Sequence, residues 1–336
     1  TVLSAPTVVM HGTLLLLPLT IAVVAASGVS VLQPPSNRIA AALPRQGFEL
    51  RSSACPRSTH GLATITPVYQ QSLKLFGVQL GAATSFAISL AATANGLNRF
   101  AHFFTLGYGL SIASMAAAGL AAAKITTPAA FMHNVGLLLH GVRMSAFVAE
   151  RDRSSSWKDR DAILAELDAK YGKKERLLPW AAYAAFYGLL YSPGLCHLRN
   201  PSLASSVFRP LFAYGITGLG LALQWGGLAL EAVADHQKQA FKRELRAAGK
   251  PDTWCNTGLY SRIRHPNYLG EQLFWIGSAL AGLPAMNSGV QLIAGGLGTA
   301  GILSTMRAAE AKLESKQRAK YGGIKRGLGY KEYIDS

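Results

Sequence analysis

Long stretches without any charged side chain limit most strongly how this chain can fold. The stretch from Gln272 to Met306 contains no Asp, Glu, Lys or Arg. A helix that crosses the hydrocarbon core of a bilayer needs about 20 mostly apolar residues, and a segment in lipid must satisfy its own backbone hydrogen bonds. Only 15% of all residues are charged, compared with about 25% in soluble domains. The sequence therefore predicts an all-α, polytopic transmembrane helix bundle with six to eight spans.

Eight segments are candidate spans, and six of them carry no charged residue. They are Val9–Val31, Val78–Asn98, Ala101–Ala123, Pro128–Val148, Leu178–Leu195, Pro210–Leu230, Tyr268–Leu283 and Gly289–Met306. The first, fourth and seventh are the least secure, the fourth because it contains Arg143 and the seventh because it is short and contains Glu271. A soluble core helix is the alternative for the shorter segments. We thus expect an N-terminal hydrophobic segment plus Pro/Ser/Arg-rich linker at 1–77, a transmembrane bundle at 78–306 and a basic C-terminal tail at 307–336.

Basic residues gather in three segments between or after the expected spans. Glu150–Arg176 has eight Lys and Arg, Asp235–Asn267 has seven, and Arg307–Ser336 has eight. If pairs of helices separate them, all three lie on one face of the membrane, as expected for segments that stay on the cytosolic, stromal or matrix side. The net charge of +16 is then mostly a topology signal. Nucleic acid is not expected as a partner, because the basic residues alternate with acids and apolar spans.

The N-terminal segment bears on the membrane in which the protein resides. Thr1–Asn37 has no charged side chain, and a processed precursor would explain a chain that starts at Thr1. A secretory signal needs a basic start and a shorter apolar core, so we expect Val9–Val31 to be a retained helix or hydrophobic anchor. The Pro, Ser and Arg residues of Gln33–Thr66 favour an irregular linker. We expect an integral membrane protein of a chloroplast or mitochondrial membrane, with the endoplasmic reticulum as the alternative.

Cysteine and histidine spacing predicts no metal site. The three cysteines, Cys55, Cys196 and Cys255, lie far apart and form no metal-ligand spacing. His133 and His140 are seven residues apart and thus near one helical face. Without a third ligand, packing or interhelical hydrogen bonds explain them better than a metal.

A dense polar cluster stands where the second basic segment meets an uncharged run. Its polar members are Arg264, His265, Asn267, Tyr268 and Glu271. Arg can bind a phosphate or carboxylate through two hydrogen bonds, while the other side chains fix the orientation of the ligand. A capped helix start at Pro266 is the alternative interpretation, but the cluster has more polar groups than a cap needs. Ionisable groups at membrane depth favour a functional site.

A pair of carboxylates precedes this cluster. Glu231 and Asp235 are four residues apart and project from one helical face where the Pro210–Leu230 span ends. Like charges at this spacing repel each other unless a cation lies between them, and Arg262 or Arg264 could supply that cation. Alternatively, the carboxylates hold ribose hydroxyls or an amide while the arginines hold phosphate. A salt-bridge cluster without a ligand is the third possibility.

Three sequence blocks resemble one known family. Arg264-His265-Pro266-Asn267-Tyr268-Leu269-Gly270-Glu271 resembles the cofactor-binding signature of the steroid 5-alpha-reductase-like membrane proteins, a reductase-like branch related to the isoprenylcysteine carboxyl methyltransferases. Leu230–Gln237 followed by Phe241 is similar to the Glu-x-x-Ala-Asp-x-Gln-x-x-x-Phe block of that group. Leu137–Met144 is a weaker match to its Trp-Gly-x-Arg-Leu helix. The resemblance covers roughly residues 130 to 333, and the first hundred residues show no match.

The resemblance implies a membrane reductase that uses NADPH. The residues that would contact the cofactor are Glu231, Asp235, Gln237, Arg264, His265, Asn267, Tyr268 and Glu271, and the basic tail would pack on the cofactor side. The substrate would be a lipid-soluble molecule with a conjugated carbon-carbon double bond. Tyrosine suits the role of proton donor. Tyr183, Tyr187 and Tyr191 are candidates, although packing explains an aromatic stripe at this spacing better, so the catalytic residue stays open.

Three functions remain possible from the sequence. The first is the NADPH-dependent reductase. The second is a methyltransferase that uses S-adenosylmethionine, against which Asn267 and the Glu231 to Gln237 block count. The third is a non-catalytic structural subunit of an organellar membrane complex that kept the reductase-like fold. Expected partners are membrane lipids, a lipid-soluble substrate and, for the third function, other subunits of a membrane protein complex.

Overall fold

The computed structural model describes residues 72–75, 78–153, 165–166, 168–203, 206, 208–251 and 253–321. The expected anchor Val9–Val31 and the linker lie outside these residues. Seven α-helices account for most of the described chain: α2 (Ala82–Thr93), α3 (Leu106–Ala122), α4 (Pro128–Arg153), α6 (Leu177–Arg199), α7 (Pro210–Ala247), α8 (Pro266–Gly282) and α9 (Gly289–Tyr321). Each of the seven expected spans after the first overlaps one of them, so the all-α prediction is confirmed.

Short elements connect the helices. The strands β1 (Lys74–Leu75) and β2 (Val78–Gln79) form a small antiparallel pair. The 3-10 turns are η2 (Ala94–Leu97), η3 (Phe100–Phe103), η5 (Gly258–Ser261) and η6 (Leu283–Ala285). The expected span Val78–Asn98 is therefore an α-helix only over α2, whose 12 residues reach about 18 Å. Such a helix is too short to cross the roughly 30 Å hydrocarbon core of a bilayer.

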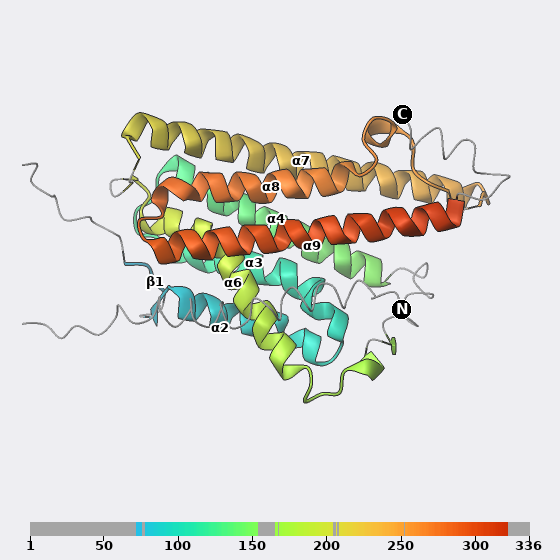
Figure 1. Ribbon diagram of the computed structural model, residues 1–336, viewed down its shortest axis with the longest axis horizontal. Helices are drawn as coiled ribbons and strands as arrows, with labels where there is room; N and C mark the ends of the chain where they lie inside the picture. The colour runs from blue at the N-terminus through green and yellow to red at the C-terminus, as the bar shows by residue number, and fades with distance from the viewer. Residues whose placement is uncertain are drawn as a thin grey trace, which may run out of the picture.

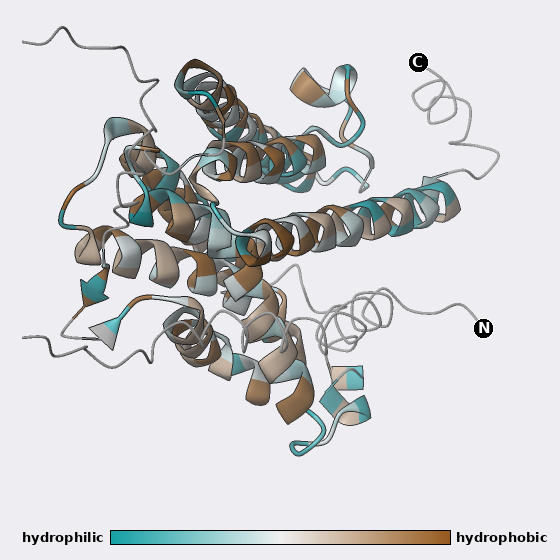
Figure 2. Cartoon of the chain, turned by 60° about the vertical axis from the view of Figure 1, so that its left-hand side comes forward, coloured by the Kyte–Doolittle hydropathy of each residue, from teal (hydrophilic) through white to brown (hydrophobic). Residues whose placement is uncertain are grey.

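Among the residues that the structure describes, three segments are long and apolar enough to cross a membrane by length and composition: Phe100–Ala122, Pro210–Ala247 and Gly289–Tyr321. The number of spans, six to eight, stays a prediction. With 38 and 33 residues, α7 and α9 are about 57 and 50 Å long, so each extends well beyond an apolar core of about 30 Å. Along α9 the residues change from hydrophobic to hydrophilic (Figure 2), and the helix continues without a break through residues 306 and 307.

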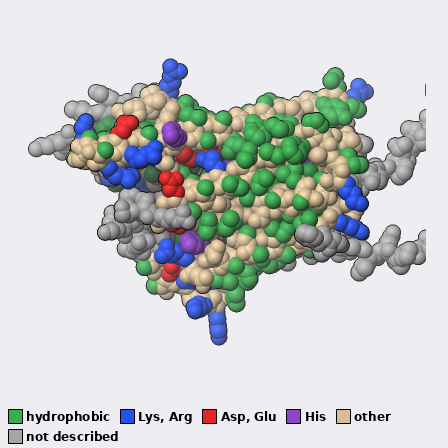
Figure 3. Space-filling model, turned by 180° about the vertical axis from the view of Figure 1, so that it is seen from behind, with side chains coloured by type: hydrophobic (Ala, Val, Ile, Leu, Met, Phe, Trp, Pro, Cys, Tyr) green, Lys and Arg blue, Asp and Glu red, His purple; other side chains and the backbone are tan. Residues whose placement is uncertain are grey.

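The charged ends of the helices lie together. The C-terminal ends of α4, α7 and α9 and the N-terminal end of α8 are all at the right of the bundle in Figure 1. From behind, Lys, Arg, acidic and His side chains gather at this end, while hydrophobic side chains cover the middle of the bundle (Figure 3). The described parts of the three basic segments thus share one end of the molecule, as the charge pattern predicts.

Glycines let α7 and α8 approach closely. A Cβ added to Gly227 on α7 would lie 2.5 Å from the carbonyl oxygen of Gly270, and one added to Gly277 on α8 would lie 2.6 Å from the carbonyl oxygen of Gly220. No side chain fits at these positions, so the two backbones pack directly against each other. A Cβ on Gly270 would also lie 2.6 Å from the backbone nitrogen of Glu231. The contact therefore sets Glu231 beside the first turns of α8.

Candidate functional site

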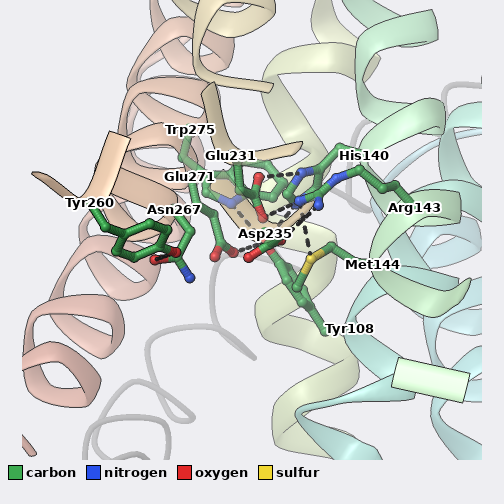
Figure 4. A network of polar contacts seen from close by, with 10 residues as sticks. All are labelled: Tyr108, His140, Arg143, Met144, Glu231, Asp235, Tyr260, Asn267, Glu271 and Trp275. Atoms are coloured by element: carbon green, nitrogen blue, oxygen red, sulfur yellow. Dashed lines mark hydrogen bonds and ion pairs between the residues drawn. The ribbon is translucent and has the colours of Figure 1, made fainter. Parts of the chain in front are cut away.

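An arginine from α4 joins the two carboxylates of α7. Arg143 Nη1 donates to Asp235 Oδ2 at 2.8 Å, and its Nη2 pairs with Glu231 Oε1 (Figure 4). Glu231 is 3% exposed, Asp235 13% and Arg143 23%, so the group lies at the edge of the buried interior. The prediction that a cation separates these like charges is confirmed. The prediction that Arg262 or Arg264 supplies it is wrong. Helix α4 lies against α7 and places Arg143 in contact with both carboxylates.

A tyrosine hydroxyl forms the centre of the adjoining buried contacts. Tyr108 on α3 donates to Glu271 Oε1 at 2.8 Å and accepts from the Trp275 indole nitrogen at 2.7 Å. His140 Nε2 lies 3.1 Å from the same hydroxyl. Tyr108 and Trp275 do not appear among the sequence candidates, because Tyr108 lies in an uncharged span and Trp275 lies in the uncharged run that follows Glu271. The sequence signals near this place are the candidate Glu271 and the Leu137–Met144 match, which contains His140 and Arg143.

His140 connects the tyrosine to the carboxylates. Its ring stacks on Phe274 at 4.2 Å between ring centres, and its Nδ1 lies 3.5 Å from Glu231 Oε2. Tyr108, His140, Arg143, Glu231, Asp235, Glu271 and Trp275 together form what we call the polar cage. The polar cage contains one permanent cation and three carboxyl groups. Its one phenol, Tyr108, belongs to the apolar core cluster of the protein.

The Arg264 to Glu271 cluster divides between two neighbours. Glu271 points into the polar cage, one and a half turns into α8. His265, by contrast, lies just before Pro266 begins the helix, and its Nε2 is 2.6 Å from Glu314 Oε1 on α9. Arg264 Nη1 lies 3.3 Å from the other oxygen of Glu314. The cluster thus contacts two different helices. Arg264 and His265 precede α8 and contact α9, whereas Glu271 lies within α8 and contacts α3.

The remaining sequence candidates shape the loop before α8. The Gln237 side-chain oxygen accepts from the Leu259 backbone nitrogen at 2.8 Å, next to Gly258, whose φ of 62° favours glycine. Asn267 accepts from the Tyr260 hydroxyl at 3.3 Å. The Tyr268 ring meets the His265 ring edge-on, with 5.8 Å between centres. The eight predicted cofactor residues therefore lie on or beside the junction of α7 and α8.

The tyrosine stripe of α6 is buried in the core. The Tyr187 hydroxyl donates to the Phe103 carbonyl at 2.8 Å, and the Tyr191 hydroxyl donates to Asn134 at 3.2 Å. Tyr183 stacks on the Phe103 ring. The Tyr187 ring centre lies 5.6 Å from that of Tyr108. These contacts agree with the packing interpretation of the stripe.

His133 makes interhelical hydrogen bonds, as expected. Its Nδ1 lies 3.1 Å from His197 Nδ1 on α6, and its Nε2 lies 2.8 Å from the Ser278 hydroxyl on α8. Within the part of the chain that the structure describes, no group of three or more His, Cys, Asp or Glu side chains is arranged to hold a metal ion.

Comparison with known proteins identifies a family for most of the chain. The family model described as "Protein of unknown function (DUF1295)" matches residues 97–335. Neither curated proteins nor solved structures give a significant match. The matched range includes α3, α4, α7 and α8, which carry every residue of the polar cage. The chain belongs to the DUF1295 family.

Proposed function

We propose that this protein is a membrane-embedded reductase that uses NADPH to reduce a carbon-carbon double bond in a lipid-soluble substrate. The observation that carries the proposal is the Tyr108 hydroxyl, which is held among apolar helices by an acid, an imidazole and an indole. Such a phenol is suited to giving a proton to a carbon atom in a dry site. The likeness of the Arg264 to Glu271 block to the steroid 5-alpha-reductase-like signature supports the same chemistry.

The side chains near the loop before α8 fit a dinucleotide. Arg264 is 45% exposed and could pair with phosphate. Asp235, at the edge of the polar cage, could accept from ribose hydroxyls, and the half-buried Asn267 and Tyr268 could orient the amide or a ring. The set contains a cation for the phosphates and acceptors for the sugars, as this ligand requires. When bound, NADPH would supply a hydride to the β-carbon of a conjugated alkene.

The residues of the chain would complete the reduction. Tyr108 would give its proton to the α-carbon, with Trp275 and His140 stabilising the resulting phenolate through hydrogen bonds. Arg143 would hold Glu231 and Asp235 in place. Because Tyr108 is 6% exposed and sits in the apolar core cluster, its partner is expected to be an apolar molecule drawn from the membrane lipids.

Labelled cofactor tests this proposal. The protein in mild detergent is first examined by mass spectrometry for bound nucleotide. It is then given NADPH with deuterium on the reactive carbon and lipids from its own membrane. We expect one deuterium in a lipid product and an equal amount of NADP⁺.

The matched variants are Tyr108→Phe and Tyr187→Phe. The first should bind nucleotide but reduce turnover about a hundredfold or more. The second should retain turnover, because the Tyr187 hydroxyl is engaged with a backbone carbonyl. Equal turnover in both variants would contradict the role of Tyr108. Labelled methyl transfer from S-adenosylmethionine without NADPH oxidation would instead support the methyltransferase.

A non-catalytic subunit is the second candidate, and one contact favours it. Glu314 engages both Arg264 and His265, which would otherwise be free for an anionic ligand. A complex of this kind would retain neither nucleotide nor adenosyl compound, even when these are supplied in excess. Co-purification of the folded protein with the same membrane partners in Tyr108→Phe would then support the structural role.

A further inference from the structure

The hydrogen bonds of Tyr108 fix the state of His140. A phenol has one hydrogen to donate and lone pairs to accept. The hydrogen goes to Glu271, and the Trp275 indole, which can only donate, approaches the oxygen at 2.7 Å. His140 Nε2 lies 3.1 Å from the same oxygen. Because the phenol hydrogen is already engaged, the imidazole must be the donor here, and its Nε2 carries a hydrogen.

The other ring nitrogen of His140, Nδ1, has no hydrogen-bond partner among the described residues. His140 Nδ1 and Glu231 Oε2 are 3.5 Å apart, both are buried, and neither atom has a hydrogen-bond partner among the described residues. If Nδ1 had no hydrogen and Glu231 were ionised, two lone pairs would face each other away from water. One proton in this gap would convert repulsion into attraction.

The charges around His140 favour such a proton. The titratable and charged groups that face it come from every helix packed against it: Tyr108 of α3, Arg143 of α4, Glu231 and Asp235 of α7, and Glu271 of α8. Three carboxyl groups stand against one arginine. A buried group with surplus negative charge binds a proton more readily than the same groups in water.

We infer that His140 and Glu231 together hold one exchangeable proton and that His140 returns it to Tyr108 after each turnover; the second part rests on the proposed function. Tyr108 breaks its O–H bond when the new C–H bond forms at the α-carbon of the substrate. His140 gives the Nε2 hydrogen to the phenolate and takes the stored proton on Nδ1. This leaves a neutral His140 with its hydrogen on Nδ1, beside an ionised Glu231. One proton from solvent, entering from the side of Asp235 and Arg143, the partly exposed members of the polar cage, and the return of a hydrogen to Nε2 restore the starting state.

The stored proton can be observed without substrate or cofactor. Infrared spectra of the protein in H₂O and D₂O report a protonated Glu231, and ¹⁵N chemical shifts of labelled histidine report a doubly protonated His140. At neutral pH we expect one of the two signals, and Glu231→Gln should remove it. Asp235→Asn removes one of the three carboxyl groups but leaves the gap between His140 and Glu231 in place, so it should weaken the signal without abolishing it. An ionised Glu231 beside a neutral His140 in the wild-type protein would overturn the inference, whatever the variants do.

The relay is tested with two histidines of α4. His140 and His133 are both fully buried, but His133 has partners on both ring nitrogens. Glutamine can bridge the same neighbours without carrying a proton. We expect His140→Gln to bind NADPH within about twofold of wild type while turnover falls at least about tenfold and becomes limited by proton delivery, with a larger solvent isotope effect. His133→Gln should retain the wild-type isotope effect.

The outcomes separate the two proposals. A normal turnover and isotope effect in His140→Gln would overturn the relay. Detection of the stored proton in a protein that oxidises no NADPH would contradict the proposed function and still support the His140 and Glu231 store.

Discussion

Arg143 and Arg176 are both held by oxygen atoms inside the protein, but Arg176 is held mainly by backbone carbonyl oxygens and Arg143 by carboxylate oxygens. Arg176 donates to the backbone carbonyls of Tyr171, Leu97, Asn98 and Asp168 at 2.8–3.0 Å. Arg143 instead binds two carboxylates, and its Nε is buried without a partner among the described residues. Backbone carbonyls cannot leave their places without unfolding the loop, whereas carboxylates can exchange an arginine for a ligand. Arg176 therefore stabilises the fold, whereas Arg143 lies in the candidate site.

The region around Arg176 supports this distinction. Asp168 accepts from the Phe100 backbone nitrogen at 2.7 Å and pairs with Arg176 at 3.1 Å. Tyr171 stacks on Phe100 with 4.4 Å between ring centres. These contacts fasten the approach to α6 onto the turns between α2 and α3. Every polar nitrogen of Arg176 is engaged, so no capacity for a ligand remains.

The largest expected effect is on Arg143. Arg143→Met would leave the buried Glu231 and the partly exposed Asp235 without a cation, which costs roughly 3–5 kcal/mol. Thermal unfolding in detergent measures the loss. Adding Glu231→Gln and Asp235→Asn should recover most of it, because neutral amides need no counterion. The penalty should also shrink as the pH falls and the carboxylates are protonated. A triple variant as unstable as Arg143→Met would contradict the ion-pair account.

A smaller effect is expected for Arg176. Arg176→Met removes several hydrogen bonds from a charged donor, for a loss of about 2–3 kcal/mol, since water can reach some of the released carbonyls. Neutralising Glu231 and Asp235 should not restore it. The denaturation midpoint measures the change, and nucleotide affinity of the folded fraction should stay at the wild-type value. Loss of affinity without loss of stability would reverse the roles assigned to the two arginines.

The smallest effect concerns the glycine contact that brings the polar cage together. Gly227→Ala would force α7 and α8 apart, at a cost of about 1–2 kcal/mol, and would move Glu231 relative to Glu271. The adjacent Gly226 is the matched control, because a Cβ there has no heavy atom within 4 Å. Gly226→Ala should be neutral or slightly stabilising. Thermal unfolding of both variants measures the difference, and equal behaviour would contradict the close packing.

Periodicity and charge predicted several parts of the structure correctly. The carboxylates of Glu231 and Asp235 share a face because a spacing of four fixes it, and their need for a cation follows from electrostatics. The sequence did not indicate which cation neutralises these carboxylates, because Arg262 and Arg264 are nearer to them in sequence than Arg143 is. Arg264 turns to Glu314 instead, 50 residues away. Contact partners at such separations depend on helix packing, which no local pattern contains.

The sequence by itself determined that this chain forms apolar helices with basic segments at one end, since uncharged runs have few other stable states in lipid. It also predicted that the candidate cofactor residues belong to the segments that form the junction of α7 and α8. Only the tertiary structure joined Tyr108 to Glu271, which is 163 residues away, and set His140 between Tyr108 and Glu231. A lone tyrosine or histidine in an apolar span has no signature of its own. Its chemistry arises from the groups that packing brings within hydrogen-bond distance.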